Sequence, residues 1–172
     1  MVAIVVPVYK STLSWNEQLS WNRCKEVFNN REIIVVHPIG LDLSAYEGYT
    51  KCIPINSQYF ESVHSYSRLM CSAFFYNYFL DFKYILIYQL DTFVFENNLE
   101  EWCASNIDYV GAPWINAIWI SKLKKKFWFM DKLIYPVGNG GLSLRKVKKF
   151  YYSSLLLAPI TWIWKKEWHE DF

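Results

Sequence analysis

The sequence predicts an α/β fold, in which helices flank a central, mostly parallel sheet within one domain. Two β-branched runs, Val2–Val6 and Ile33–Val36, lie on either side of a segment with helical spacing. This strand–helix–strand order is typical of parallel strands joined by right-handed crossovers. A third apolar run, Tyr84–Tyr88, has the composition of a strand buried on both faces. The chain has 172 residues, the length of one ordinary domain, and we expect residues 1–172 to form a single unit.

The first helix is predicted at about residues 15–29. Ser14 precedes Glu17 by three residues, which is the spacing of a capping box, and apolar residues recur along the segment that follows. Pro7 and Pro38 are expected at the ends of the first two strands, because proline cannot donate a hydrogen bond to a sheet ladder.

The remaining elements follow from similar local patterns. A mostly apolar segment long enough for one helix leads directly into the buried run, and a helix that is apolar on most faces is usually buried. Short runs on either side of it read as further strands and helices. We expect strands at Lys51–Ile55 and Tyr109–Val110, helices at Ser65–Asp81, Asn97–Cys103 and Lys146–Leu157, and a loop at Ile39–Tyr49.

Composition and charge narrow the class of protein. Aromatic residues make up 20% of the chain and its formal net charge is +2, which is too small to indicate nucleic-acid binding. The amino-terminal apolar run lacks the flanks of a signal peptide, and no run of ~18 apolar residues is present. We expect a cytoplasmic protein with reduced, mostly buried thiols and no zinc site, since no two of its cysteines form a C-x-x-C pair. The cysteines are Cys24, Cys52, Cys71 and Cys103.

Polar chemistry follows the buried run at once. Gln89 and Asp91 lie two residues apart, so they share one face if the strand geometry continues past the carboxyl edge of the sheet. Open α/β sheets bind ligands at that edge. Asp91 is therefore a candidate ligand for a hard divalent cation that carries a phosphate-bearing substrate. The alternative is an aspartate that caps a turn.

Two further segments are candidates for the same site. Gly138, Gly140 and Gly141 surround Asn139, and such a segment lets the backbone approach a ligand closely. It matches neither the dinucleotide-binding pattern nor a P-loop, and a plain tight turn is the alternative. Near the carboxyl terminus, the adjacent carboxylates Glu170-Asp171 are candidates for a general base. A solvated acidic terminus is the alternative there.

Taken in order, these segments resemble a known family. The chain carries QLDTFVF, DYVGAPW, VGNGGLSLR and an ED pair between roughly Ser65 and Asp171. This arrangement is similar to a bacterial family of glycosyltransferases with a GT-A-like, nucleotide-sugar-binding fold, whose members carry YxQLDxxxF, DYIGAPW, GNGGFSLR and NED motifs. Two departures stand out. His169 occupies the place of the family's Asn, and this chain stops one residue after the ED pair, where relatives continue into further helices.

The resemblance implies a role for each matching residue. Asp91 becomes the ligand of a divalent metal, Mn²⁺ or Mg²⁺, that bridges the donor diphosphate, and Gln89 becomes a neighbour of the ribose or sugar. Asp171, with Glu170 beside it, becomes the candidate base. The remaining expected donor-binding residues are Pro7, Arg68, Asn139, Gly140 and Gly141.

The expected function is metal-assisted transfer of a sugar from a nucleotide-diphosphate donor to a hydroxyl of a glycan or lipid-linked glycan. The alternative is a nucleotide-sugar-binding or interaction domain in which truncation has impaired catalysis. A third interpretation is peripheral contact with the inner face of the membrane. It rests on Lys122–Trp128, where a basic cluster adjoins aromatic rings, and a solvated loop is the alternative there.

Overall fold

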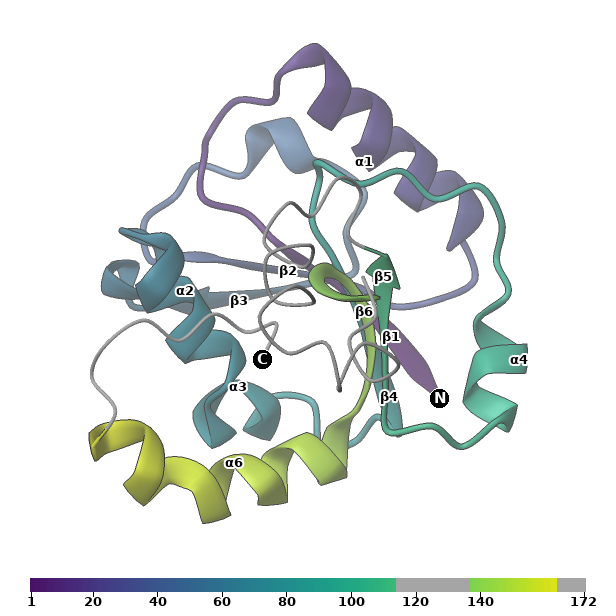
Figure 1. Cartoon of the computed structure of the whole chain (residues 1–172). Helices are drawn as coiled ribbons and strands as arrows, with labels where there is room; N and C mark the ends of the chain where they lie inside the picture. Colours follow the sequence, from purple (N-terminus) through teal and green to yellow (C-terminus); the bar gives the residue numbers. More distant parts are fainter. Residues whose placement is uncertain (114–136, 164–172) are drawn as a thin grey trace, which may run out of the picture.

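The structure is a computed structural model that describes residues 1–113 and 137–163. It has a mixed α/β architecture with a six-stranded sheet in the order β3-β2-β1-β4-β6-β5 (Figure 1). The strands are β1 Val2–Pro7, β2 Ile33–Pro38, β3 Lys51–Ile55, β4 Tyr84–Tyr88, β5 Tyr109–Pro113 and β6 Val137–Lys146. The helices are α1 Trp15–Val27, α2 Val63–Met70, α3 Ala73–Asn77, α4 Leu99–Ala104 and α6 Val147–Ile163, and short 3₁₀ turns occupy Ser44–Tyr46 and Ser57–Phe60.

Most of the sheet is parallel, as predicted. β1 pairs with β2 and β4, and β2 pairs with β3, all in parallel. β6 runs antiparallel to both of its neighbours, β4 and β5. The chain builds β2 and β3 on one side of β1 and then places β4 on the other side. The order of strands therefore reverses at β1, and open α/β sheets bind ligands outside the carboxyl ends of the strands at such a reversal.

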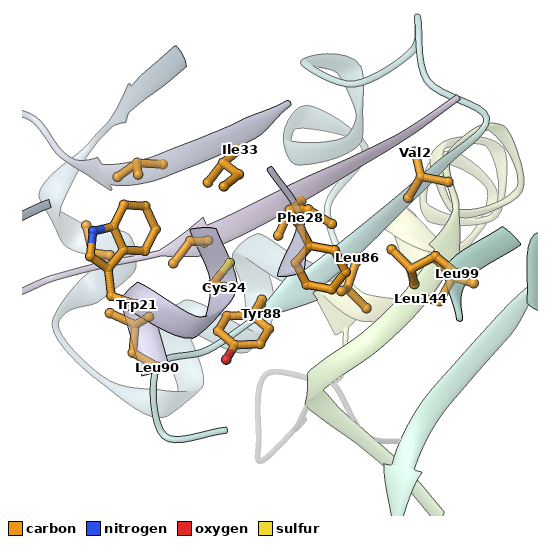
Figure 2. Packing of buried hydrophobic residues seen from close by; sticks show 14 of the residues in the cluster. Val2, Trp21, Cys24, Phe28, Ile33, Leu86, Tyr88, Leu90, Leu99 and Leu144 are labelled. Carbon is orange, nitrogen blue, oxygen red and sulfur yellow. The ribbon is translucent and has the colours of Figure 1, made fainter. Parts of the chain in front are cut away.

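Helices cover both faces of the sheet, and each face has its own core. Val2, Ile4 and Val6 of β1 point to one face. There they pack with Trp21 and Cys24 of α1 and with Phe28, which follows the helix (Figure 2). Alternate residues of β1 point to the other face, which α2, α3 and α6 cover (Figure 1). The two-residue alternation explains why β1 is apolar throughout, since both of its faces are buried.

The first helix begins as the sequence predicted. The side chain of Ser14 accepts a hydrogen bond from the Glu17 amide at 3.3 Å, and the Ser14 amide donates to Glu17 Oε2 at 2.8 Å. This reciprocal pair satisfies two amides that the helix itself leaves without partners. The helix ends at Val27, two residues earlier than expected.

The predicted long helix at Ser65–Asp81 is wrong, because two short helices occupy that segment. α2 ends at Met70 and α3 begins at Ala73. Ser72 causes the break: its Oγ accepts from the Phe75 amide at 3.2 Å and donates to the Leu69 carbonyl at 2.7 Å. Serine competes for backbone hydrogen bonds in this way and so favours a cap over a helix interior.

Smaller differences occur elsewhere. The helix expected at Asn97–Cys103 lies at Leu99–Ala104, and the last helix begins at Val147 rather than Lys146. The thiols are free, but only Cys24 is buried; Cys52 is exposed and the other two are half-buried, so the expectation of mostly buried cysteines is wrong. In the described part of the chain, no helix combines the length and apolar character that a membrane crossing requires.

Candidate functional site

A cleft of about 560 Å³ lies at the carboxyl ends of β1 and β4. This is the place that the reversal of strand order predicts. Its described walls come from the end of β1 and the segment after it, α1, the two 3₁₀ turns, the start of α2, the segment after β4 and the glycine-rich part of β6. The residues concerned are Pro7, Val8, Tyr9, Lys10, Glu17, Tyr46, Phe60, Glu61, Ser62, Val63, Tyr66, Ser67, Gln89, Leu90, Asp91, Asn139 and Gly141.

The chain turns sharply as it leaves β4. The Thr92 amide donates to the Gln89 carbonyl at 3.0 Å, and the Thr92 hydroxyl donates to the same oxygen at 2.6 Å. The extended geometry therefore stops at Tyr88, and Gln89 and Asp91 do not share a strand face as the sequence pattern suggested. Both residues nevertheless line the cleft, with Asp91 exposed and Gln89 half-buried.

Gln89 connects two walls of the cleft. Its backbone N–H donates to the Gly141 carbonyl of β6 at 2.8 Å, and its side-chain Nε2 donates to the Tyr66 hydroxyl of α2 at 2.9 Å. The side-chain oxygen Oε1 lies against Gly141, where an added Cβ would stand only 2.6 Å away. Gln89 is thus held on both sides, and a side chain at position 141 would force the end of the Gln89 side chain to move.

The glycine-rich segment is a bulged strand rather than the tight turn that stood as the alternative. Ser143 pairs with Gly111 of β5, and the next residue of β5, Ala112, pairs with Asn139. The register of β6 against β5 therefore shifts between these two pairs, and this β-bulge bends the strand. Gly138 has a φ of +116°, a conformation that favours glycine.

Gly111 of the GAPW segment explains how the two edge strands come so close. A Cβ on this residue would lie 2.8 Å from backbone atoms of Gly138 and 2.7 Å from the Tyr109 hydroxyl. That hydroxyl donates to the Gly138 carbonyl at 2.8 Å. The absence of a side chain at Gly111 therefore lets β5 support the bulge that reaches the cleft.

An ion pair at the cleft, between Lys10 and Glu17, was not among the residues that the sequence singled out. Lys10 Nζ lies 3.0 Å from Glu17 Oε1, and the buried Tyr46 hydroxyl donates to the Lys10 carbonyl at 2.7 Å. Hydrogen bonds from Ser14 lower the pKa of Glu17 to about 2, so this carboxylate is ionised near neutral pH. The position of Lys10, three residues after the end of β1 at the carboxyl edge of the sheet, is the signal that identifies it.

Charge in the cleft opposes an unaccompanied anion. The described lining holds one ammonium, Lys10, and three carboxylates, Glu17, Glu61 and Asp91, which give a formal net charge of −2. A diphosphate in this cleft would meet repulsion unless a cation came with it. The electrostatics therefore favour a ligand that pairs its negative charge with a metal ion.

The donor set fits a metal that is shared with a ligand and not a preformed metal site. Among residues 1–113 and 137–163, no group of three or more His, Cys, Asp or Glu side chains is placed to hold an ion. Asp91 offers one exposed carboxylate at the cleft. Mg²⁺ is commonly bound through one or two carboxylates together with substrate phosphates and water, and a single aspartate meets that requirement.

The structure brings together most of the residues that the sequence singled out. Pro7, Gln89, Asp91, Asn139 and Gly141 all line the cleft. Gly140 is buried within the bulge beside them. Arg68 is exposed on α2 and is not among the described lining residues. Glu170, Asp171 and the basic cluster at Lys122–Trp128 lie outside the described residues.

Comparison with known proteins identifies relatives of the fold and of the sequence. The model of a family described as "Protein of unknown function (DUF5672)" matches residues 50–168. A crystal structure of the galactosyltransferase LgtC in complex with donor and acceptor sugar analogues superposes with a TM-score of 0.62 at 14% identity, covering 99% of this chain and 68% of that chain. The structure of an LgtC active-site mutant gives a TM-score of 0.60 with the same identity and coverage. No curated protein matches the sequence.

At this level of identity the likeness to LgtC shows the fold. The expected GT-A-like architecture, a mostly parallel sheet between helices, is thereby confirmed. The family match, residues 50–168, covers most of the Ser65–Asp171 region on which the sequence resemblance rests.

Proposed function

This chain belongs to the DUF5672 family, and we propose that it is a glycosyltransferase. It transfers a sugar from a nucleotide-diphosphate-sugar to a hydroxyl of a glycan or lipid-linked glycan. The observation that carries the proposal is the cleft where the strand order reverses, with Asp91, Gln89 and Asn139 in its walls. Support comes from the fold, which is shared with a galactosyltransferase whose crystals held donor and acceptor sugar analogues.

Each wall of the cleft has a part in binding the donor. Asp91 holds the divalent ion, Mn²⁺ or Mg²⁺, which when bound neutralises the charge that develops on the leaving diphosphate. Gln89 and Asn139 present fixed amide groups to hydroxyls of the ribose or sugar. The Gln89–Tyr66 hydrogen bond of 2.9 Å holds the glutamine in place before the donor arrives, so little ordering remains to oppose binding.

The acceptor hydroxyl must lose its proton as it attacks the sugar. We assign this role to Asp171, with Glu170 as its neighbour. Transfer lost in Asp171→Asn with nucleotide binding retained is the expected result. If Glu170→Gln alone loses transfer, Glu170 is the base and Asp171 its neighbour. If both variants keep full activity, neither residue is the base.

The test of the proposal is a thermal-shift and calorimetry panel of UDP, GDP, UDP-glucose, UDP-galactose and GDP-mannose, each with MnCl₂, with MgCl₂ and with EDTA. At least one nucleotide should stabilise the protein with metal and not with EDTA. Asp91→Asn should weaken that binding by roughly tenfold or more, because a carboxylate–metal contact is charge-assisted. Asp81→Asn is the matched control, since Asp81 is exposed and lies away from the cleft.

Two results would contradict the proposal. If no compound of the panel binds, the protein does not use a nucleotide-sugar donor. If the wild type and Asp91→Asn bind equally well, Asp91 is not a metal ligand. Metal-dependent binding without transfer to any acceptor would instead select the alternative, a nucleotide-sugar-binding domain with impaired catalysis.

A further inference from the structure

A buried guanidinium lies behind the cleft wall, on β6. Arg145 is only 1% exposed, which is rare for a charged side chain and costly unless hydrogen bonds compensate. Its described hydrogen bonds reach two places. Nε donates to Ser143 Oγ at 2.9 Å and Nη2 to the Gly140 carbonyl at 3.2 Å, while Nη1 donates to the Tyr76 hydroxyl at 2.9 Å.

The contacts on β6 converge on one carbonyl. Ser143 Oγ also donates to the Gly140 carbonyl, at 2.8 Å, so this oxygen accepts from both the serine and the arginine. Gly140 lies in the bulge, where the register of β6 against β5 shifts. Arg145 and Ser143 therefore both hold a carbonyl at the point where the regular ladder is interrupted.

The same peptide group points toward the cleft. The Gly140 carbonyl and the Gly141 amide belong to one planar unit, so fixing the oxygen also fixes the direction of the N–H. That N–H donates to Asn139 Oδ1 at 2.8 Å. A hydrogen-bonded carbonyl polarises its peptide group and strengthens the N–H as a donor. Arg145 thus acts on Asn139 through one peptide unit.

This arrangement determines which end of the Asn139 amide remains for a ligand. Oδ1 is occupied by the Gly141 amide, and Asn139 lines the cleft. Nδ2 carries two hydrogens and has no hydrogen bond recorded within the described residues, so it is the group left to donate into the cleft.

The other arm of Arg145 reaches the opposite wall. Nη1 lies 3.4 Å from the Met70 carbonyl, at the end of α2, and the Tyr76 hydroxyl donates to the same carbonyl at 2.8 Å. α2 carries Tyr66, which holds Gln89. The guanidinium therefore ties the bulge of β6 to the helix that forms the facing wall.

We infer that Arg145 is a positioning residue, which holds the Gly140–Gly141 peptide so that Asn139 presents Nδ2 as a donor to an oxygen of the bound nucleotide-diphosphate-sugar. The inference rests on the proposed function for the identity of the ligand. The geometry of the Gly140–Gly141 peptide does not depend on it.

The first experiment needs no ligand. Amide hydrogen exchange of Gly141 is followed by NMR in the wild type, Arg145→Lys and Ser143→Ala. Both variants should exchange the Gly141 amide roughly tenfold faster or more, because they loosen the carbonyl of the same peptide, while amides of β1 and β2 keep their rates. Tyr109→Phe is the control, since it removes a hydrogen bond to the neighbouring Gly138 and keeps the ring that lies beside Arg145. Unchanged Gly141 exchange in both variants would overturn the inference.

The second experiment separates positioning from general support of the fold. A double-mutant cycle combines Arg145→Lys with Asn139→Ala, and calorimetry measures binding of the nucleotide-sugars UDP-glucose, UDP-galactose and GDP-mannose with MnCl₂. Arg145→Lys should weaken binding by roughly tenfold alone and by less than about twofold beside Asn139→Ala, because residues that act through one contact are not additive. If the losses of binding are additive, Arg145 supports the fold and does not act through Asn139.

The two experiments fail in different ways. If the wild type binds none of the panel, the proposed function is wrong, while the exchange of Gly141 still decides whether Arg145 holds the peptide. If the wild type binds and the losses are additive, the proposed function stands and the positioning role falls.

Discussion

Gly141→Ala tests the contact between the two cleft walls directly. A Cβ at this position would lie 2.6 Å from Gln89 Oε1, 3.1 Å from Gln89 Cδ and 3.2 Å from Asn139 Oδ1. The backbone of Gly141 has no positive φ that would itself penalise alanine. Most of the effect of the substitution should therefore come from the side chain of Gln89, which must move away, while Asn139 Oδ1 need shift by only a few tenths of an ångström.

The size of the effect follows from three contributions. Moving Gln89 breaks its 2.9 Å hydrogen bond to the Tyr66 hydroxyl, at a net cost of about 1 kcal/mol. Crowding adds about 1 kcal/mol, the low end for overpacking, because the atom displaced is the end of a side chain. Replacing glycine by alanine returns about 0.5 kcal/mol through the unfolded chain. We expect Gly141→Ala to lower the free energy of unfolding by about 1.5 kcal/mol.

The assay is urea unfolding of four proteins: the wild type, Gly141→Ala, Gln89→Ala and the double variant. In the Gln89→Ala background the two closest atoms are absent and only Asn139 Oδ1 stays near, so Gly141→Ala should change stability by less than about 0.5 kcal/mol in either direction. An equal loss of about 1.5 kcal/mol in both backgrounds would refute the reasoning. The larger change Gly141→Val should in addition reduce sugar transfer more than nucleotide binding, because it displaces Gln89 and Asn139, to which the proposed function assigns contacts with the sugar.

Two further predictions concern the protein without its ligand. Glu17→Gln should lower the free energy of unfolding by about 1 kcal/mol at pH 7, the typical worth of a helix cap. Hydrogen bonds from Ser14 lower the pKa of Glu17 from 4.5 to about 2. The difference in stability from the wild type should therefore shrink as the pH falls from 4.5 toward 2. A gap that stays constant in pH-dependent urea melts would contradict this. Burial raises the pKa of the Cys24 thiol to about 12, whereas Cys52 is exposed. A thiol reagent at pH 8 should therefore modify Cys52 quickly and Cys24 only after denaturation. Equal rates of modification, followed by mass spectrometry, would contradict this and show that α1 opens readily.

Much of the fold could be predicted from sequence because its signals are local. The β-branched runs of β1 and β2 and the apolar run of β4 are complete within five or six residues each. The capping box of α1 needs only Ser14 and Glu17. Since the order of these elements restricts the topology, the carboxyl edge of the sheet and the polar residues that follow β4 could be predicted from the chain alone.

The glycine-rich segment shows where such prediction stops. Read locally, Gly138–Gly141 has the composition of a turn, and the structure makes it the start of an antiparallel strand between β4 and β5. Its conformation depends on backbone hydrogen bonds to strands that are distant in sequence, and no local propensity encodes them. The split between α2 and α3 is a different case, because the Ser72 side chain hydrogen-bonds to Leu69 and Phe75, three residues away on either side, so its signal was local.

The amino-acid sequence by itself determined the α/β class, the first two strands, the start of α1 and the residues that gather at the carboxyl edge. Only the tertiary structure decided how those residues face one another: the turn that separates Gln89 from Asp91, the contact of Gln89 with Gly141, and the hold of Arg145 on Gly140. The physical reason is that each of these depends on atoms brought together by strand pairing, and a hydrogen bond or a steric contact acts over a few ångströms of space whatever the separation along the chain.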